Sequence, residues 1–201
     1  MSCVTPMELI GQIARLQIQE SSLKVGESPR RWYDPAPIRV VPVLTLNENG
    51  VVGRTATGDT MLDVHNTIHL ASKNRVGGNG ISVGFTSHYG AMRARFGDHL
   101  ADGIAGENIL VATERMFTAA DVASGIRIET SDGAMIDLEQ VIIAEPCVEF
   151  SRYALRYPRD APSDRAVTDA LNFLRDGTRG FYATYRGTPA TIAVGASVYL
   201  L

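Results

Sequence analysis

The stretch Ile142-Ile143-Ala144-Glu145-Pro146-Cys147-Val148-Glu149-Phe150 predicts a strand that ends where a helix begins. Proline is tolerated in the first turn of a helix, because the N–H that it lacks would have no partner there. Cys147 would then lie near free backbone N–H groups that favour negative charge, and Arg152 adds positive charge further along the predicted helix. Such surroundings favour the thiolate, the form of cysteine that attacks electrophiles or binds a soft metal. The alternative is a purely structural cysteine, because free cysteines are often buried in cores.

The size and composition of the chain predict one soluble globular domain over residues 1–201, with residues 1–9 as a flexible tail. A chain of 201 residues suits a single domain, and 45% hydrophobic residues are enough for a core. The net charge of -3 gives no electrostatic case for binding nucleic acid or an anionic membrane. Two cysteines, Cys3 and Cys147, do not make a disulfide framework, and we expect a reducing, cytoplasmic location.

Arginine supplies nearly all of the positive charge, since Lys24 and Lys73 are the only lysines in the chain. The planar guanidinium group suits fixed recognition of phosphate or carboxylate, so a small-molecule substrate is expected. The shortage of lysine argues against a Schiff-base mechanism.

Hydrophobic alternation and turn residues predict many short strands and few helices. The predicted strands are 12–19, 38–46, 81–85, 107–112, 125–130, 134–144, 180–185 and 191–200, and the predicted helices are 88–96, 148–157 and 163–175. Asn49-Gly50 predicts a tight hairpin turn, whereas residues 26–37 are predicted to be loop. Because strands and helices do not alternate, the pattern favours a mainly β protein (α+β) with helical insertions, built as a β-barrel.

The segment 53–80 is the least readable part of the chain. His65 and His69 would share one face if the segment were helical, which is a spacing that can bind a metal ion. No glutamate completes a zinc-protease pattern, so chance spacing is the simpler interpretation. The Gly77-Gly78-Asn79-Gly80 cluster lacks the lysine and spacing of a phosphate-binding loop and by itself indicates a turn.

Four motifs in the same order resemble the MOSC-domain family, which is related to the C-terminal domain of molybdenum cofactor sulfurases. The motifs are Val76-Gly77-Gly78 before the segment 81–96, Ile104-Ala105-Gly106-Glu107-Asn108-Ile109, Pro146-Cys147, and the closing strands with Gly180-Phe181-Tyr182 and Gly195-Ala196-Ser197-Val198. The chain departs from the family at Val76, where the family has histidine, and at Glu145, where a basic residue is usual.

The resemblance implies a closed or nearly closed β-barrel of the MOSC or pyruvate-kinase-barrel type. It also implies a molybdenum–pterin cofactor, with Cys147 as the metal ligand or as a sulfur carrier in persulfide form. Asn108 would contact the polar or phosphate end of the pterin, and we expect it to line one pocket with Cys147. The other residues that we expect at the cofactor are Gly77, Gly78, Gly106, Glu107, Pro146 and, from its place on the predicted helix, Arg152.

Three hypotheses about function follow. In the first, the protein binds molybdenum cofactor through Cys147 and reduces N-hydroxylated small molecules, with electrons from a redox partner protein. In the second, Cys147 acts without a metal, as a nucleophile or sulfur carrier. In the third, the barrel is a non-catalytic binder of small molecules. Self-association into a homodimer is left open, and neither nucleic acid nor a membrane is expected as a partner.

Overall fold

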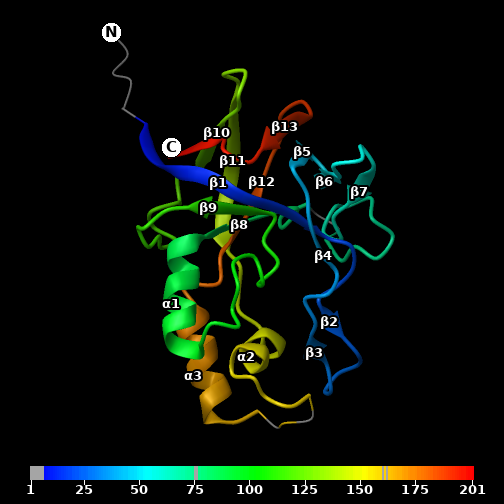
Figure 1. Ribbon diagram of the computed structural model, residues 1–201, viewed down its shortest axis with the longest axis vertical. Coiled ribbons are helices and arrows are strands. Elements are labelled where there is room, and N and C mark those ends of the chain that lie inside the picture. Colours follow the sequence, from blue (N-terminus) through cyan, green and yellow to red (C-terminus); the bar gives the residue numbers. More distant parts are fainter. Residues whose placement is uncertain (1–6, 75–76, 160, 162) are drawn as a thin grey trace.

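A closed β-barrel forms the centre of the structure, a computed structural model that describes residues 7–74, 77–159, 161 and 163–201 (Figure 1). In this described part seven strands close the barrel, in the order β14-β10-β11-β12-β8-β9-β1, with β1 pairing back to β14. They are β1 (Glu8–Gln19), β8 (Ile81–Phe85), β9 (Ile109–Ala112), β10 (Ile126–Glu129), β11 (Met135–Ile143), β12 (Phe181–Thr184) and β14 (Ser197–Leu200). The predicted mainly β fold with a closed barrel is confirmed.

The barrel is mixed, because β8 and β9 run parallel while the other neighbouring strands of the barrel run antiparallel. A parallel pair needs a crossover connection, which helix α1 (Thr86–Phe96) provides here. The structure therefore contains one β-α-β unit, whereas the sequence pattern showed no such alternation. The predicted strand 81–85 and the hairpin formed by β10 and β11 are confirmed.

Two buried clusters hold the fold together. The first fills the barrel interior and includes Ile13, Val83 and Phe85. The second lies between the barrel and the helices and includes Tyr89 of α1 and Phe150. Strand β8 is buried along its whole length, since the barrel interior and α1 cover its two faces. Burial of one such large apolar side chain stabilises the fold by about 1.5–3 kcal/mol.

Helices α2 (Val148–Ala154) and α3 (Arg165–Leu174) are inserted between β11 and β12, and all three helices of the described residues gather at one end of the barrel (Figure 1). Asp164 caps α3, because its Oδ1 accepts the N–H of Val167 at 3.1 Å. No helix within the described ranges is long and apolar enough to cross a membrane.

A smaller sheet with the order β13-β5-β6-β7 lies beside the barrel (Figure 1). Its strands are β5 (Val43–Asn47), β6 (Gly50–Arg54), β7 (Thr60–Leu62) and β13 (Ala190–Ala193). The predicted hairpin is confirmed, but its turn residues are Glu48 and Asn49 rather than Asn49 and Gly50, since Gly50 already pairs with Asn47 in the sheet. The strand expected over 191–200 is two strands, β13 and β14, in different sheets.

Some predicted boundaries need correction. The strand predicted over 38–46 is interrupted at Pro42, which separates β4 (Ile38–Val40) from β5. The predicted loop 26–37 contains β3 (Trp32–Tyr33), which pairs with β2 (Lys24–Val25). Strand β1 begins at Glu8, inside the predicted tail, because it pairs there with β14; residues 1–6 of that tail lie outside the described residues.

Candidate functional site

Cys147 lies at the predicted junction, after β11 and at the N-cap of α2. Its backbone is extended, with φ −120° and ψ 157°, and its Sγ accepts the N–H of Phe150 at 3.5 Å. The side chain is a half-buried free thiol that packs against the second core cluster. Pro146, also half-buried, precedes it and delivers the cysteine to the start of the helix.

A cavity of about 620 Å³ opens beside the Cys147 thiol. Its walls come from the end of β1 and the β2–β3 hairpin, from residues 64–74 with Asn79, and from Arg179 and Tyr182 at the start of β12. This size lies within the usual range for small-molecule sites, roughly 300–1,000 Å³. The cavity can therefore hold a ligand of cofactor size against the sulfur.

Positive charge predominates in the lining of this cavity. Lys24, Arg31, Lys73 and Arg179 line it, against the carboxylates Glu27 and Glu145. Both lysines of the chain are thus found here, although they are 49 positions apart in the sequence (73 − 24). Such a lining favours an anionic ligand, for example one that carries a phosphate group.

Arg179 is the most firmly held of these cations. Its Nη2 donates to the carbonyl oxygen of Ala105 at 2.6 Å, and its guanidinium carbon lies 5.5 Å from the centre of the Phe150 ring. Burial by itself lowers the pKa of Arg179, but the charges of neighbouring groups, Tyr182 and Cys147 among them, raise the pKa overall. Arg179 is therefore a fixed positive charge whose field reaches the Cys147 sulfur.

Glu149 supplies a carboxylate on the other side of Cys147. The side chain is 8% exposed, and its Oε1 lies 2.9 Å from Nη2 of Arg31. Burial raises the pKa of Glu149, but its own backbone N–H, the charges of Lys24 and Arg31 and a hydrogen bond with the Cys147 thiol lower it overall. Glu149 is thus a charged acceptor next to the thiol, and it was not singled out from the sequence.

Asn108 does not line the cavity with Cys147, although the two were expected to share a pocket. It is 1% exposed, and its Oδ1 accepts hydrogen bonds from both the N–H and the hydroxyl of Ser82. Its Nδ2 donates to the carbonyl oxygen of Gln17 and to Oδ2 of Asp63. Because every polar atom of the amide is occupied by protein groups, Asn108 is a structural bridge between segments of the barrel.

Gly106 and Glu107 also lie behind the cavity wall. Gly106 has a φ of +88°, and a Cβ there would lie 2.6 Å from Cδ1 of Leu23, so only glycine fits. Glu107 is 1% exposed; its Oε2 accepts from the hydroxyl of Tyr89 at 2.8 Å, and its Oε1 has no hydrogen-bond partner among the described residues. Burial raises the pKa of Glu107 and the hydrogen bond from Tyr89 offsets part of this effect.

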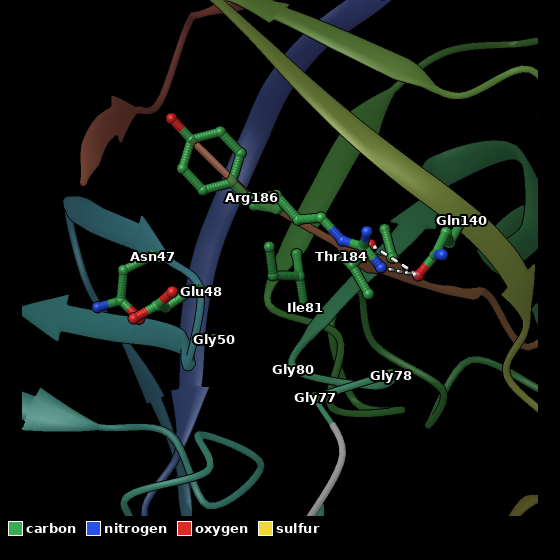
Figure 2. Close-up of a pocket in the computed structure, with 12 residues that line it drawn as sticks. Asn47, Glu48, Gly50, Gly77, Gly78, Gly80, Ile81, Gln140, Thr184 and Arg186 are labelled. Atoms are coloured by element: carbon green, nitrogen blue, oxygen red, sulfur yellow. Dashed lines mark hydrogen bonds between the residues drawn. The ribbon is translucent and has the colours of Figure 1, made fainter. Parts of the chain in front are cut away.

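Gly77 and Gly78 line a different cavity of about 330 Å³, next to the turn between β5 and β6 (Figure 2). There Arg186 donates from Nη2 to Oε1 of Gln140 at 3.3 Å. The cavity beside Cys147 does not include these two glycines. Val76, which precedes them, lies outside the described residues.

Arg152 lines a third cavity, of about 310 Å³, and is not among the described residues that line the Cys147 cavity. Helix α2 turns its side chain toward Ser163, and Nη2 donates to the Ser163 hydroxyl at 3.1 Å. Of the predicted site residues, the structure therefore brings only Cys147 to the large cavity. Sequence reasoning missed Arg31, Arg179 and Asn74, although the scarcity of lysine could have drawn attention to Lys24 and Lys73.

The histidine pair is not a metal site. The segment around His65 and His69 is not helical, and His65 Nδ1 lies 2.9 Å from Oδ1 of Asp63. Within the ranges that the structure describes, no group of three or more histidine, cysteine, aspartate or glutamate side chains could hold a metal ion. Cys147 is the one thiol among the residues that line this cavity, and a metal at that sulfur would need further ligands from a cofactor.

The cavity residues do fit a molybdenum–pterin cofactor. A thiolate is a soft ligand that suits such a metal, and the two lysines with Arg179 can pair with a phosphate group. Asn74 lines the cavity and is 4% exposed, and its Oδ1 has no hydrogen-bond partner among the described residues. This buried acceptor matches the N–H groups of a pterin ring. Glu145, an exposed carboxylate of the lining, opposes an anion close to Cys147, as does Glu27 elsewhere in the lining.

Comparison with known proteins identifies the fold. No protein-family model matches the chain, and no curated protein matches its sequence. The YUAD protein from Bacillus subtilis is similar in structure, with a TM-score of 0.57 at 12% identity, over 96% of this chain and 97% of that one. YiiM from Geobacillus stearothermophilus gives a TM-score of 0.50 at 15% identity, over 98% of this chain and 75% of its own. YiiM from Escherichia coli gives 0.50 at 14% identity, over 98% and 70%. YiiM is a MOSC-domain protein, so the chain has a MOSC-like fold.

Proposed function

We propose that this protein has a MOSC-type function: it binds a molybdenum–pterin cofactor in the cavity beside Cys147 and reduces N-hydroxylated small molecules. One observation carries the proposal. A free thiol opens onto a cavity of about 620 Å³ whose lining holds Lys24, Lys73, Arg31 and Arg179. A soft metal ligand and an anion-binding wall in the same cavity are the two features that such a cofactor requires.

Each cavity residue has a distinct task in this proposal. Cys147 is the protein ligand to the metal, and its place at the N-cap of α2 holds the sulfur at the cavity wall. Lys24, Lys73 and Arg179 neutralise the phosphate, while Asn74 Oδ1 accepts a hydrogen bond from the pterin. When bound, the cofactor supplies a redox-active metal.

The overall conversion would break the N–O bond of the substrate and release its oxygen as water. It consumes two electrons and two protons, so a redox partner protein must supply the electrons and solvent the protons.

The decisive experiment is the molybdenum content of protein purified from a host that overproduces the cofactor. Wild-type protein should retain molybdenum, and Cys147→Ala should fold but lose it, because the metal loses its protein ligand. Arg165→Ala is the matched control, since this side chain is 96% exposed on α3, and it should retain the metal. Circular dichroism of each variant checks the fold.

The two positions at which the chain departs from the family, Val76 and Glu145, allow a second test. The double substitution Val76→His with Glu145→Arg restores the residues that the resemblance expects. If wild-type protein and this double variant both purify without molybdenum, the proposal is wrong.

The place of the Cys147 thiol at the N-cap of α2 favours a second candidate function, in which the cysteine works without a metal. Its Sγ accepts the N–H of Phe150 at 3.5 Å, and a sulfur held at a helix N-terminus can act as a nucleophile or a sulfur carrier. Protein without molybdenum that still carries a persulfide on Cys147, measured by mass spectrometry, would support this candidate.

A further inference from the structure

The cavity that Arg152 lines is here called the Trp32 pocket, and it adjoins the Cys147 cavity at Arg31 and Tyr33. Its volume is about 310 Å³, and Arg31 and Tyr33 line both cavities. Strand β3 contributes Trp32, and α2 with the residues that follow it contributes Arg152 and Tyr157. Strand β3 and α2 pack side by side at the end of the molecule away from the barrel (Figure 1).

Three buried N–H donors of this pocket have no hydrogen-bond partner among the described residues: Arg31 Nε, Trp32 Nε1 and Arg152 Nε. Both guanidinium groups are held elsewhere by their outer nitrogens, Arg31 on Glu149 and Arg152 on Ser163. Buried donors are nearly always paired, and leaving one unpaired costs free energy. Three unpaired donors that line one small cavity therefore indicate a site for hydrogen-bond acceptors.

The net charge of the lining indicates which kind of acceptor the pocket suits. The lining contains three arginines and two carboxylates, so its net charge is one positive charge; these residues are Arg31, Arg152, Arg159, Asp34 and Glu149. Glu149 is already paired with Arg31 at 2.9 Å. A ligand with a single negative charge would balance this lining, and a carboxylate presents two oxygens to several N–H donors at once.

The remaining lining residues are mainly aromatic side chains and prolines. Trp32, Tyr153 and Tyr157 line the pocket together with two prolines. The guanidinium carbon of Arg159 lies 4.4 Å from the centre of the Trp32 ring, so this side of the pocket already holds a planar group against the indole. A planar ring could pack against the same walls.

We propose that the Trp32 pocket binds a small aromatic carboxylate. The carboxylate oxygens accept the N–H groups of Arg31, Trp32 and Arg152, and the ring packs against the aromatic walls. This site shares Arg31 and Tyr33 with the cavity of Cys147, but it does not depend on a cofactor there.

The chain offers a direct probe, because Trp32 is its only tryptophan. Titration with benzoate should change the tryptophan fluorescence in a saturable way, whereas neutral benzamide, of the same shape, should not. In an NMR spectrum of labelled protein, the single indole N–H signal should shift with benzoate. This second measurement needs no variant.

Substitutions test whether benzoate binds in the Trp32 pocket. Arg152→Gln should weaken benzoate binding about tenfold or more, because a charged donor is lost. Arg165→Gln, an exposed arginine of α3, should leave the affinity unchanged. Cys147→Ala should also leave it unchanged, so this test is independent of the molybdenum experiment.

Three results would overturn the proposal. One is an indole signal that does not move at saturating benzoate. Another is equal binding of benzamide, or of acetate and inorganic phosphate, which would remove the need for an aromatic carboxylate. The last is an affinity of folded Arg152→Gln equal to that of the wild type.

Discussion

Replacement of Asn108 by alanine tests whether this residue is structural or belongs to a cofactor site. Four hydrogen bonds are lost, with distances of 2.9–3.2 Å: two from Ser82, one to the carbonyl of Gln17 and one to the carboxylate of Asp63. A neutral bond contributes about 1 kcal/mol and one to a charged group about 1.5–3 kcal/mol. Since Asp63 is 0% exposed and remains buried, we expect Asn108→Ala to lower the free energy of unfolding by about 4.5–6 kcal/mol.

Urea unfolding followed by circular dichroism measures this loss. With a slope of about 2 kcal/mol per molar urea, the midpoint should fall by about 2–3 M. Asn172→Ala is the matched control, because Asn172 is exposed on α3, and it should change the stability by no more than about 0.5 kcal/mol. If Asn108→Ala unfolds within about 1 kcal/mol of the wild type, the hydrogen bonds do not stabilise the barrel and the structural argument is wrong. Normal stability together with loss of molybdenum would restore the prediction that Asn108 contacts the cofactor.

Two further predictions concern His88 of α1 and Gly177 in the loop between α3 and β12. Burial lowers the pKa of His88 from 6.5 to about 4, so below pH 6.5 the unfolded chain takes up a proton that the folded protein does not. His88 should therefore leave the free energy of unfolding unchanged above pH 6.5 and lower it as the pH drops toward 4. The loss between pH 7 and pH 5 should be about 2 kcal/mol. If urea unfolding of His88→Gln shows the same pH dependence as the wild type, this prediction is wrong. Gly177 has a φ of +96°, and a Cβ there would lie 2.2 Å from Cζ of Phe181, so Gly177→Ala should destabilise the protein by about 1–3 kcal/mol. Gly78→Ala, with nothing within 4 Å of its Cβ, serves as the control, and equal melting temperatures of the two variants would refute the steric argument.

The resemblance to a family predicted the fold better than it predicted the residues of the site. Pro146-Cys147 was correctly placed at a strand-to-helix junction, because both the proline and the apolar run before it are local signals. The Gly106-Glu107-Asn108 motif was predicted to lie at the cofactor, but none of its three residues lines the Cys147 cavity, and Glu107 and Asn108 are buried behind its wall. A buried structural amide and a ligand-binding amide look alike in a sequence, since only the position of their partners distinguishes them.

Local physical chemistry explains what the sequence by itself determined. Strands 81–85 and 135–143, the cap at Asp164 and the position of Cys147 follow from alternation, turn residues and capping, which act between residues a few positions apart. The tertiary structure alone decided the parallel pairing of β8 with β9 and the charge of the Cys147 cavity. Lys24, Lys73 and Arg179 come from three distant segments, and they meet only because the barrel closes and brings those segments together. Closure depends on pairing between residues far apart in the chain, which no local pattern records.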